Sequence, residues 1–520
     1  MPERARDPHE ERPAGAGGER GDSPAPLARK QAGLLLDEPL IFERSRPGRR
    51  GFCVTTSESD AAGLPSEMVR APIDGFPEVS EPDVLRHFLR LSQWNYGTAT
   101  TFYPLGSCTM KYNPVANEAV ARLQGFAGLH PLAPDDAAQG ALELIWQLER
   151  LLAEISGMKA VSLQPAAGAQ GELTGMKMVR AYHVERGRAR RKVLIPASAH
   201  GTNPASATLC GYSTVQIERS HNGLLDVDAV RQVMDDDVAA LMVTNPNTLG
   251  LFEREITQVS EVVHEHGGLV YLDGANLNAL MGVAKPAHMG ADVLQFNLHK
   301  TFSTPHGGGG PGAGPVGVSE ALVPYLPTPR LVRSEGQLRW SEDFPQSIGR
   351  VRSFYGNFGM LVRAFAYILA MGGDGLTAAT QTAVLSANYI RRRLEGAYQL
   401  AYPGVCMHEC VFSDKGFEAF GVKTLDIAKR LLDYGFYAPT IYFPLVVSGA
   451  IMIEPTETES KETLDQFIDA MLAIAREARE QPARLHTAPT LTPVGRLDEA
   501  RAARRPVLRW NALRATPPPS

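Results

Sequence analysis

Short apolar runs alternate with helical patterns from about residue 161 to residue 318, and this alternation limits the possible folds more than any other feature of the chain. The strand-like runs lie at residues 193–196, 240–244, 269–272 and 293–296. Between two of them, residues 256–266 carry Ile and Val at helical spacing before two glycines end the segment. Strand, helix and strand in this order predict right-handed crossovers and a mostly parallel sheet flanked by helices. The predicted fold class is therefore α/β.

The rest of the chain divides into further parts on either side of this large domain, which we place at residues 131–371. Residues 1–33 contain six acidic side chains, which targeting peptides avoid, so they predict a disordered tail. An N-terminal extension with a long loop follows at residues 34–130. A smaller α/β domain is expected at residues 372–481, and a C-terminal extension at residues 482–520.

Local patterns predict several elements outside the large sheet. Apolar residues at helical spacing predict helices over residues 81–93 and 142–155, and Gly157 would end the second. Residues 95–113 lack regular periodicity and contain Gly, Pro and aromatic residues, so we expect a long ordered loop. Strands are expected at residues 419–422 and 450–453 in the small domain.

Charge and apolar patterning exclude two classes of partner. The 52 basic and 57 acidic residues give a net charge of −5, so no broad positive field attracts nucleic acid or an anionic membrane. No apolar run has the length that spans a bilayer. We therefore expect a protein that binds neither nucleic acid nor membrane.

The five cysteines are odd in number and scattered, which favours a reducing compartment, with the cytoplasm as the simplest choice. Cys406, His408 and Cys410 have the spacing of a metal or redox pair. No second cluster accompanies them, so a structural role is favoured and no metal is expected.

An aspartate and a lysine stand at the ends of two of the expected strands. Asp273 ends the run at 269–272, and Lys300 lies 27 residues later, just after the run at 293–296. That separation is about one crossover unit, so both side chains would reach the same crevice. A pyridine cofactor needs these two groups, a carboxylate at the ring nitrogen and an amine that forms a Schiff base. Two solvated surface charges would give the same spacing.

Three more turns follow expected strands, and each has an ordinary structural explanation beside the functional one. Gly168, Ala169 and Gln170 precede a helix and would let N–H groups approach a phosphate, or form a plain tight turn. His200 would stack on a bound ring, or be a satisfied loop histidine. Asn247 would donate to an oxygen of the cofactor, or belong to a simple turn.

The joint order of these groups is more specific than any one of them. Phosphate turn, histidine, amide, aspartate and lysine follow successive strands, and this order resembles the fold-type-I, aminotransferase-like family of pyridoxal-phosphate enzymes. The resemblance implies pyridoxal 5′-phosphate bound in the large domain, with Lys300, Asp273 and His200 as its catalytic residues. Gly168, Ala169, Gln170 and His299 would contact its phosphate, and Asn247 its ring oxygen.

Longer stretches sharpen the resemblance to one family. Residues 39–50, 102–111, 200–206, 273–278 and 299–312 resemble signature stretches of glycine dehydrogenase (decarboxylating), the P-protein of the glycine cleavage system. Single-chain members are nearly twice this length, with a lysine-free first half. A chain of 520 residues therefore resembles the lysine-bearing second subunit of the split form.

The resemblance implies an aminomethyl-transferring oxidoreductase that decarboxylates glycine and passes the aminomethyl group to the lipoyl group of H-protein. Its implied partners are a lysine-free subunit 1, with two copies of each chain in a heterotetramer, and the lipoylated H-protein. The loop at 101–113 would line the glycine site or the lipoyl entrance through Ser107, Cys108, Thr109 and Lys111, although an exposed loop with an ordinary lysine is the alternative.

Other activities remain open at this point. Another fold-type-I enzyme, such as an amino-acid decarboxylase or a hydroxymethyltransferase, would carry the same cofactor groups. A non-catalytic structural subunit is the alternative from a different class. The sequence does not choose among Arg333, Arg350 and Arg352 as the residue that grips the substrate carboxylate.

Overall fold

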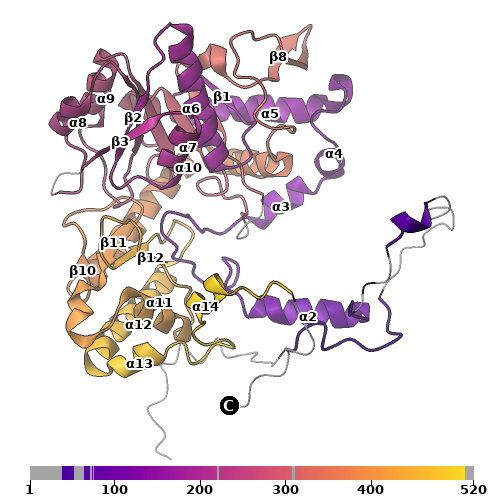
Figure 1. Ribbon diagram of the computed structural model, residues 1–520, viewed down its shortest axis with the longest axis vertical. Helices are drawn as coiled ribbons and strands as arrows, with labels where there is room; N and C mark the ends of the chain where they lie inside the picture. Colours follow the sequence, from indigo (N-terminus) through magenta and orange to yellow (C-terminus); the bar gives the residue numbers. More distant parts are fainter. Residues whose placement is uncertain are drawn as a thin grey trace, which may run out of the picture.

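A computed structural model describes residues 38–51, 64–70, 73, 75–218, 222–306 and 311–509. Figure 1 shows two stacked bodies, a larger one built on the main sheet and a smaller one that contains α11 to α13, with an arm that carries α2 extending from the smaller body. The predicted N-terminal tail, Cys53 and the glycine run at 307–310 lie outside the described residues.

The main sheet has seven strands in the order β1-β7-β6-β5-β4-β2-β3. All neighbouring pairs are parallel except those that β7 makes with β1 and β6, which are antiparallel. The mostly parallel sheet predicted from the sequence is confirmed. The strands are β1 (Ala160–Ser162), β2 (Lys192–Pro196), β3 (Ser213–Ile217), β4 (Val238–Thr244), β5 (Leu269–Gly274), β6 (Val293–Phe296) and β7 (Val316–Val318).

Each face of this sheet is covered by its own helices. Successive side chains of a strand point to opposite faces, so Leu241 and Val243 of β4 join one apolar core while Ala240 and Met242 join the other. The first core includes side chains of α5 (Asp135–Ser156), α8 (Val227–Val233) and α9 (Ile256–Glu265); the second includes those of α6 (Gly168–Glu185) and α7 (Thr202–Leu209). Burial on both faces explains why the strands are continuous apolar runs.

The small domain packs helices on an antiparallel sheet of order β10-β11-β13-β12. The long helix α10 (Phe358–Leu394) leads into it, and Gly372 breaks its backbone with φ 60° and ψ −178° at the residue where our proposed small domain begins. The strands are β10 (Gln399–Leu400), β11 (Cys410–Ser413), β12 (Thr440–Ile441) and β13 (Ala450–Ile453). The covering helices are α11 (Thr424–Asp433), α12 (Lys461–Glu480) and α13 (Pro482–Thr487).

Shorter elements complete the described chain. They are η1 (Ser66–Met68), α2 (Glu81–Gln93), α3 (Val115–Ala121), α4 (Gln124–Ala127), η2 (Pro286–Met289), η3 (Glu320–Tyr325), β8 (Arg330–Ser334), β9 (Gln337–Ser341), η4 (Asp414–Phe420) and α14 (Glu499–Arg504). Within this part of the chain, no helix combines the length and the apolar composition needed to cross a bilayer.

Most of the expected elements are present, and one is wrong. The helix predicted at 81–93 is α2, and the helix predicted at 142–155 belongs to α5, which ends at Gly157 with φ 75°. The strand predicted at 419–422 does not form. Those residues include the end of η4 and a left-handed turn at Gly421. Within this run Val422 is buried, whereas Ala419 and Phe420 are exposed. The short apolar run therefore forms a turn with one buried side chain rather than a pleated strand.

Candidate active site

A cavity of about 320 Å³ opens at the carboxyl ends of β4, β5 and β6, and it also contacts the small domain. Ligands in open parallel sheets bind at this edge because the loops that follow the strands converge there. The residues that line the cavity are Ser107, Ala167, Gly168, Ala169, Glu172, His200, Thr202, Thr244, Pro246, Thr248, Asp273, Ala275, Asn276, Asn297, His299, Lys300, His306, His408 and Glu409.

Lys300 projects into this cavity from the turn after β6. Its Nζ donates a 2.7 Å hydrogen bond to the backbone carbonyl of Ser107, which belongs to the long loop before α3. A residue nearly two hundred positions earlier in the chain thus fixes the direction of the lysine amine. The loop predicted from residues 95–113 is therefore a wall of the same cavity.

Asp273, at the end of β5, reaches the same cavity and is 4% exposed. Its carboxylate accepts hydrogen bonds from Asn203 Nδ2 at 3.1 Å and from the Ala275 N–H at 2.9 Å. Asn203 also donates to Glu172 at 3.0 Å, so one amide bridges two buried acids. Burial, and then the charge of Asp273, raise the pKa of Glu172 to about 7.

The turn between β1 and α6 forms another wall of the cavity. Gly168 and Ala169 begin α6, and no described side chain caps this helix end, so its first N–H groups are available to an anion. The turn lies against residues 312–314, and a Cβ added to Gly314 would lie 2.0 Å from the Ala167 carbonyl oxygen. Close backbone packing therefore requires glycine at Gly314.

His200 and His299 are two of the four histidines that line the cavity, and the pKa of each is lowered. His200 Nδ1 lies 2.8 Å from the Thr202 hydroxyl, and partial burial lowers the pKa of the ring although Asp273 opposes this shift. Burial, and then His306 and Lys300, lower the pKa of His299 to about 3. The Ala313 N–H donates to His299 Nδ1 at 3.2 Å, which leaves the ring proton on Nε2 of a neutral imidazole.

Two predicted cofactor-binding residues, Asn247 and Gln170, form hydrogen bonds with other protein groups instead of lining the cavity. Asn247 is fully buried, and its side chain bonds to Gly223, Leu249, Leu251 and Glu253. Gln170 accepts from the Ala166 N–H at 2.7 Å and donates to the Val351 carbonyl at 2.9 Å. Their proposed cofactor contacts remain untested, and in this structure Thr248 and Pro246 stand in the wall where Asn247 was expected.

The other predicted loop residues, beyond Ser107, are not among the residues that line the cavity. Burial raises the pKa of the Cys108 thiol, while the nearby Lys300 charge opposes this shift. Thr109 donates from its hydroxyl to Glu454 at 2.6 Å. Lys111 is buried and forms a 2.6 Å ion pair with Glu457. Cys108, Thr109 and Lys111 thus remain proposals as substrate contacts.

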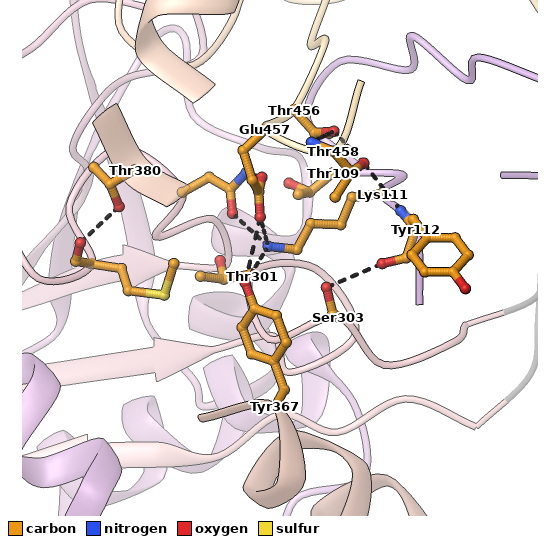
Figure 2. A network of polar contacts seen from close by, with 12 residues as sticks. Thr109, Lys111, Tyr112, Thr301, Ser303, Tyr367, Thr380, Thr456, Glu457 and Thr458 are labelled. Carbon is orange, nitrogen blue, oxygen red and sulfur yellow. Dashed lines mark hydrogen bonds and ion pairs between the residues drawn. The ribbon is translucent and has the colours of Figure 1, made fainter. Parts of the chain in front are cut away.

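Lys111 is the centre of a polar network that joins three parts of the chain (Figure 2). Its Nζ contacts Glu457 after β13, and it lies 3.4 Å from both Asn278 Oδ1 and the Tyr367 hydroxyl. Burial lowers the pKa of Lys111, but Glu457 and Tyr367 outweigh it, so the net shift is upward. A charged lysine that is fully paired in this way attaches the loop to both domains.

The three arginines considered as carboxylate grips all have protein partners away from the cavity. Arg333 pairs with Glu143 at 2.9 Å, Arg350 pairs with Glu342, and Arg352 donates to Asn357 at 3.4 Å. None of the three is among the residues that line the described cavity.

Sequence reasoning missed several groups that line the cavity. Glu172 and Thr202 lie beside turns that were predicted to contribute to the site. Their positions after strands could therefore have identified them as further candidate residues. His408 and Glu409 come from the small domain, just before β11, and no local pattern associates them with Lys300. Thr244, at the end of β4, has a buried hydroxyl without a hydrogen-bond partner among the described residues.

Two family models match the chain. One, described as "Glycine cleavage system P-protein", covers residues 62–336, and the other, "Glycine dehydrogenase, C-terminal domain", covers residues 379–488. This chain belongs to the glycine cleavage system P-protein family. It is 55% identical over 480 residues to a probable glycine dehydrogenase (decarboxylating) subunit 2 from Bacillus velezensis, covering 91% of this chain and 98% of the relative. A Chlorobium chlorochromatii protein of the same description is 55% identical over 475 residues, covering 90% and 99%.

Solved structures support the fold. The chain is similar to a glycine decarboxylase (P-protein) in inhibitor-bound form, with a TM-score of 0.67 and 21% identity over 79% of this chain and 94% of the other. It is also similar to an aspartate aminotransferase from Thermus thermophilus, with a TM-score of 0.54 and 14% identity over 72% and 99%. The fold-type-I prediction is confirmed.

The cofactor of this P-protein-family chain is pyridoxal 5′-phosphate, and the cavity has the groups that it needs. An amine, a buried carboxylate and an uncapped helix N-terminus share one cavity at Lys300, Asp273 and Gly168. The buried Thr244 hydroxyl, which has no described partner, is a further group that a polar ligand would satisfy.

We expect Gly314→Ala to weaken binding of pyridoxal phosphate about tenfold or more, because the new Cβ meets the Ala167 carbonyl and displaces the turn at a cost of roughly 1–3 kcal/mol. An absorbance titration of the cofactor measures this. Gly140→Ala is the matched control, since its Cβ meets nothing within 4 Å. Equal affinity in both variants would contradict the packing role of Gly314.

Glu172 should make folding stability depend on pH. Its folded pKa of about 7 lies above the ordinary 4.5, so the fold is most stable with the acid protonated and loses stability as pH rises from about 4.5 to about 7. We expect Glu172→Gln to match the cofactor-free wild type near pH 5 and to exceed it by roughly 1–3 kcal/mol near pH 8. Urea unfolding at both pH values measures the difference.

The control for this prediction is Glu261→Gln, on the exposed face of α9. The difference in the free energy of unfolding between this control variant and the wild type should be the same at both pH values. A constant difference for Glu172→Gln would show that this acid does not titrate near neutrality.

Proposed function

We propose that this chain is the lysine-bearing subunit of a split glycine dehydrogenase (decarboxylating). It would decarboxylate glycine and transfer the aminomethyl group to the lipoyl group of H-protein. The observation that carries the proposal is that Lys300 and Asp273 open into one cavity beside an uncapped helix N-terminus. The subunit 2 relatives, similar over nearly their whole length, support the choice of glycine over other substrates of this fold.

Bound pyridoxal phosphate would supply a conjugated ring that accepts the electrons released when CO2 leaves glycine. Lys300 would hold the aldehyde carbon of the cofactor, and Asp273 would keep a proton on the ring nitrogen. Two donors already orient the Asp273 carboxylate, so it needs no rearrangement to receive the ring. His200 would lie over the ring.

The phosphate would be held at the other end of the cavity. The N–H groups of Gly168 and Ala169 at the start of α6 would donate to it. His299 is neutral with its proton on Nε2, and would therefore donate a hydrogen bond without adding a charge. The protein side of the cofactor site is thus largely formed before binding.

A lysine-free subunit 1 is the partner that we propose, with two copies of each chain in the assembly. The "subunit 2" names of the relatives support such a partner. The arm with α2 extends away from the small domain in Figure 1, and it exposes Leu85, Phe88 and Leu89, which are each more than half exposed. A second chain would bury this apolar face. The scattered cysteines support the cytoplasm as its location.

Exchange of labelled CO2 into glycine, measured with lipoylated H-protein and the partner subunit, tests the proposal. We expect Asp273→Asn to bind the cofactor but to exchange CO2 more slowly by on the order of 10²-fold, because the ring nitrogen loses its charged partner. Asp228→Asn, an exposed pair with Arg231, is the control and should exchange normally.

Two results would contradict the proposal. A near-normal exchange rate in Asp273→Asn would remove the role of this carboxylate. Exchange that does not need the lipoylated carrier would instead favour an ordinary amino-acid decarboxylase.

A further inference from the structure

Two residues of the loop beside Lys300 have left-handed backbone angles that residues other than glycine rarely adopt. Ser107 has φ 65° and Thr109 has φ 42°. Such conformations are energetically unfavourable and persist where surrounding groups hold them. Ser107 is also the residue whose carbonyl accepts the hydrogen bond from Lys300. The position of the lysine amine therefore depends on whatever stabilises this strained segment.

Two glutamates of the small domain hold the backbone of the strained segment. The Ser107 N–H donates to Glu409 at 2.8 Å, and the Thr109 N–H donates to Glu454 at 3.1 Å. The Thr109 hydroxyl adds a 2.6 Å bond to Glu454. Glu409 and Glu454 are 3% and 0% exposed, so these bonds form away from solvent.

Strand register explains why the two glutamates are neighbours. In the antiparallel pair β11 and β13, Cys410 lies opposite Ile453. Glu409 is the next residue before β11 and Glu454 the next after β13, so they continue the same cross-strand alignment. The loop also packs closely on β13, since a Cβ on Gly106 would lie 2.2 Å from the Met452 side chain and 2.8 Å from its carbonyl oxygen.

His408, Glu409 and Glu454 bring ligand-type atoms within 4.8 Å of one another, and all three are buried. The Nδ1 atom of His408 has no hydrogen-bond partner among the described residues. However, the carboxyl groups already accept N–H and O–H donors from the loop, with Asn276 Nδ2 adding a 2.9 Å bond to Glu454. The cluster is built to receive donors from the loop rather than a cation.

We propose that Glu409 and Glu454 are positioning residues that act through Ser107, with Glu409 supplying one acceptor oxygen to the loop and Glu454 supplying two. Together they hold the loop so that the Ser107 carbonyl faces Lys300 Nζ. The small domain thereby fixes the direction of the lysine of the large domain through the backbone N–H and C=O of one residue, Ser107.

The two acids accept different numbers of hydrogen bonds. Glu454 accepts three donors and uses both of its side-chain oxygens. Glu409 accepts one, from Ser107. Burial, and then the Glu454 charge, raise the pKa of Glu409 well above its ordinary range, although the Ser107 N–H and Lys300 oppose this shift. His408 faces the pair as a ring whose pKa burial lowers, so it does not supply a compensating charge.

This difference predicts opposite responses to the same substitution. Glu409→Gln keeps a neutral group with one acceptor oxygen for the Ser107 N–H, so it should preserve the loop. Glu454→Gln leaves one acceptor oxygen for three donors and should release the loop. Glu409→Ala should also release it, because the Ser107 N–H loses its acceptor in a buried site.

Hydrogen–deuterium exchange of the Ser107 and Thr109 amides in the full-length chain measures the loop directly, without cofactor. We expect exchange to accelerate about tenfold or more in Glu454→Gln and Glu409→Ala, and to stay near the wild-type rate in Glu409→Gln. Glu149→Gln, a partly buried acid that accepts a hydrogen bond from Tyr355 in the large domain, is the control and should leave these amides unchanged.

A second measurement separates positioning of the lysine from a general loss of structure. In Glu454→Gln, the pH at which the chain captures pyridoxal phosphate half-maximally should fall by about half a unit or more, because the protonated amine loses its carbonyl acceptor. Glu409→Gln should keep the wild-type profile. The capture measurement rests on the proposed function, because it takes Lys300 as the amine that captures the cofactor. The hydrogen–deuterium exchange measurement does not rest on it.

The results that would overturn the inference are specific. If Glu409→Ala leaves both amides exchanging at the wild-type rate, the glutamates do not hold the loop. If Glu409→Gln and Glu454→Gln behave alike, the inference that the loop needs two acceptor oxygens from Glu454 but only one from Glu409 is wrong. Trapping of the cofactor on another lysine would instead overturn the proposed function and leave the exchange result standing.

Discussion

Parallel pairing of β4, β5 and β6 is the constraint on which the site depends. Thr244 lies opposite Asp273 in the β4–β5 register, and Asp273 lies opposite Gln295 in the β5–β6 register. The segments that follow these strands must therefore leave the sheet at one edge, where Lys300 also lies. No single contact draws the aspartate and the lysine together. Their proximity follows from backbone hydrogen bonds in the centre of a buried sheet.

The large domain alone does not complete the cavity. Ser107 belongs to the N-terminal extension, while His408 and Glu409 belong to the small domain, and all three line the cavity that Lys300 enters. The loop around Ser107 is attached to both bodies through the buried Lys111, which pairs with Glu457 of the small domain and contacts Asn278 and Tyr367 of the large one (Figure 2). A change in how the two domains pack would therefore alter the surroundings of the lysine amine. This arrangement connects the fold of the small domain to the chemistry of the large one.

Sequence reasoning predicted the parts of the site that depend on local order. Strand ends and turns are visible as apolar runs followed by polar residues, and so Asp273, Lys300 and Gly168 were correctly placed in one crevice. The side-chain partners of Asn247 and Lys111 were not predictable in the same way. An amide after a strand can turn inward or outward, and Asn247 bonds to its own loop and to Glu253. A lysine in a polar loop gives no sign that Glu457, hundreds of residues later, will bury it.

The groups that were missed come from long-range pairing. Glu409 reaches the cavity because β11 pairs with β13 and the small domain packs on the loop. Neither contact can be predicted from the residues around Glu409. The strand wrongly expected at 419–422 shows the opposite case, in which a local apolar run forms a turn that leaves Phe420 exposed and buries Val422. Local pattern thus predicts elements and strand ends, while tertiary packing selects which polar groups meet.

The most direct test of the central claim is reduction of the cofactor-loaded chain with borohydride, followed by peptide mapping. The reductant fixes pyridoxal phosphate to the amine that holds it. The account predicts that the label is on Lys300 and that it disappears in Lys300→Ala. A label on Lys111 or another lysine, or no label at all, would contradict the account.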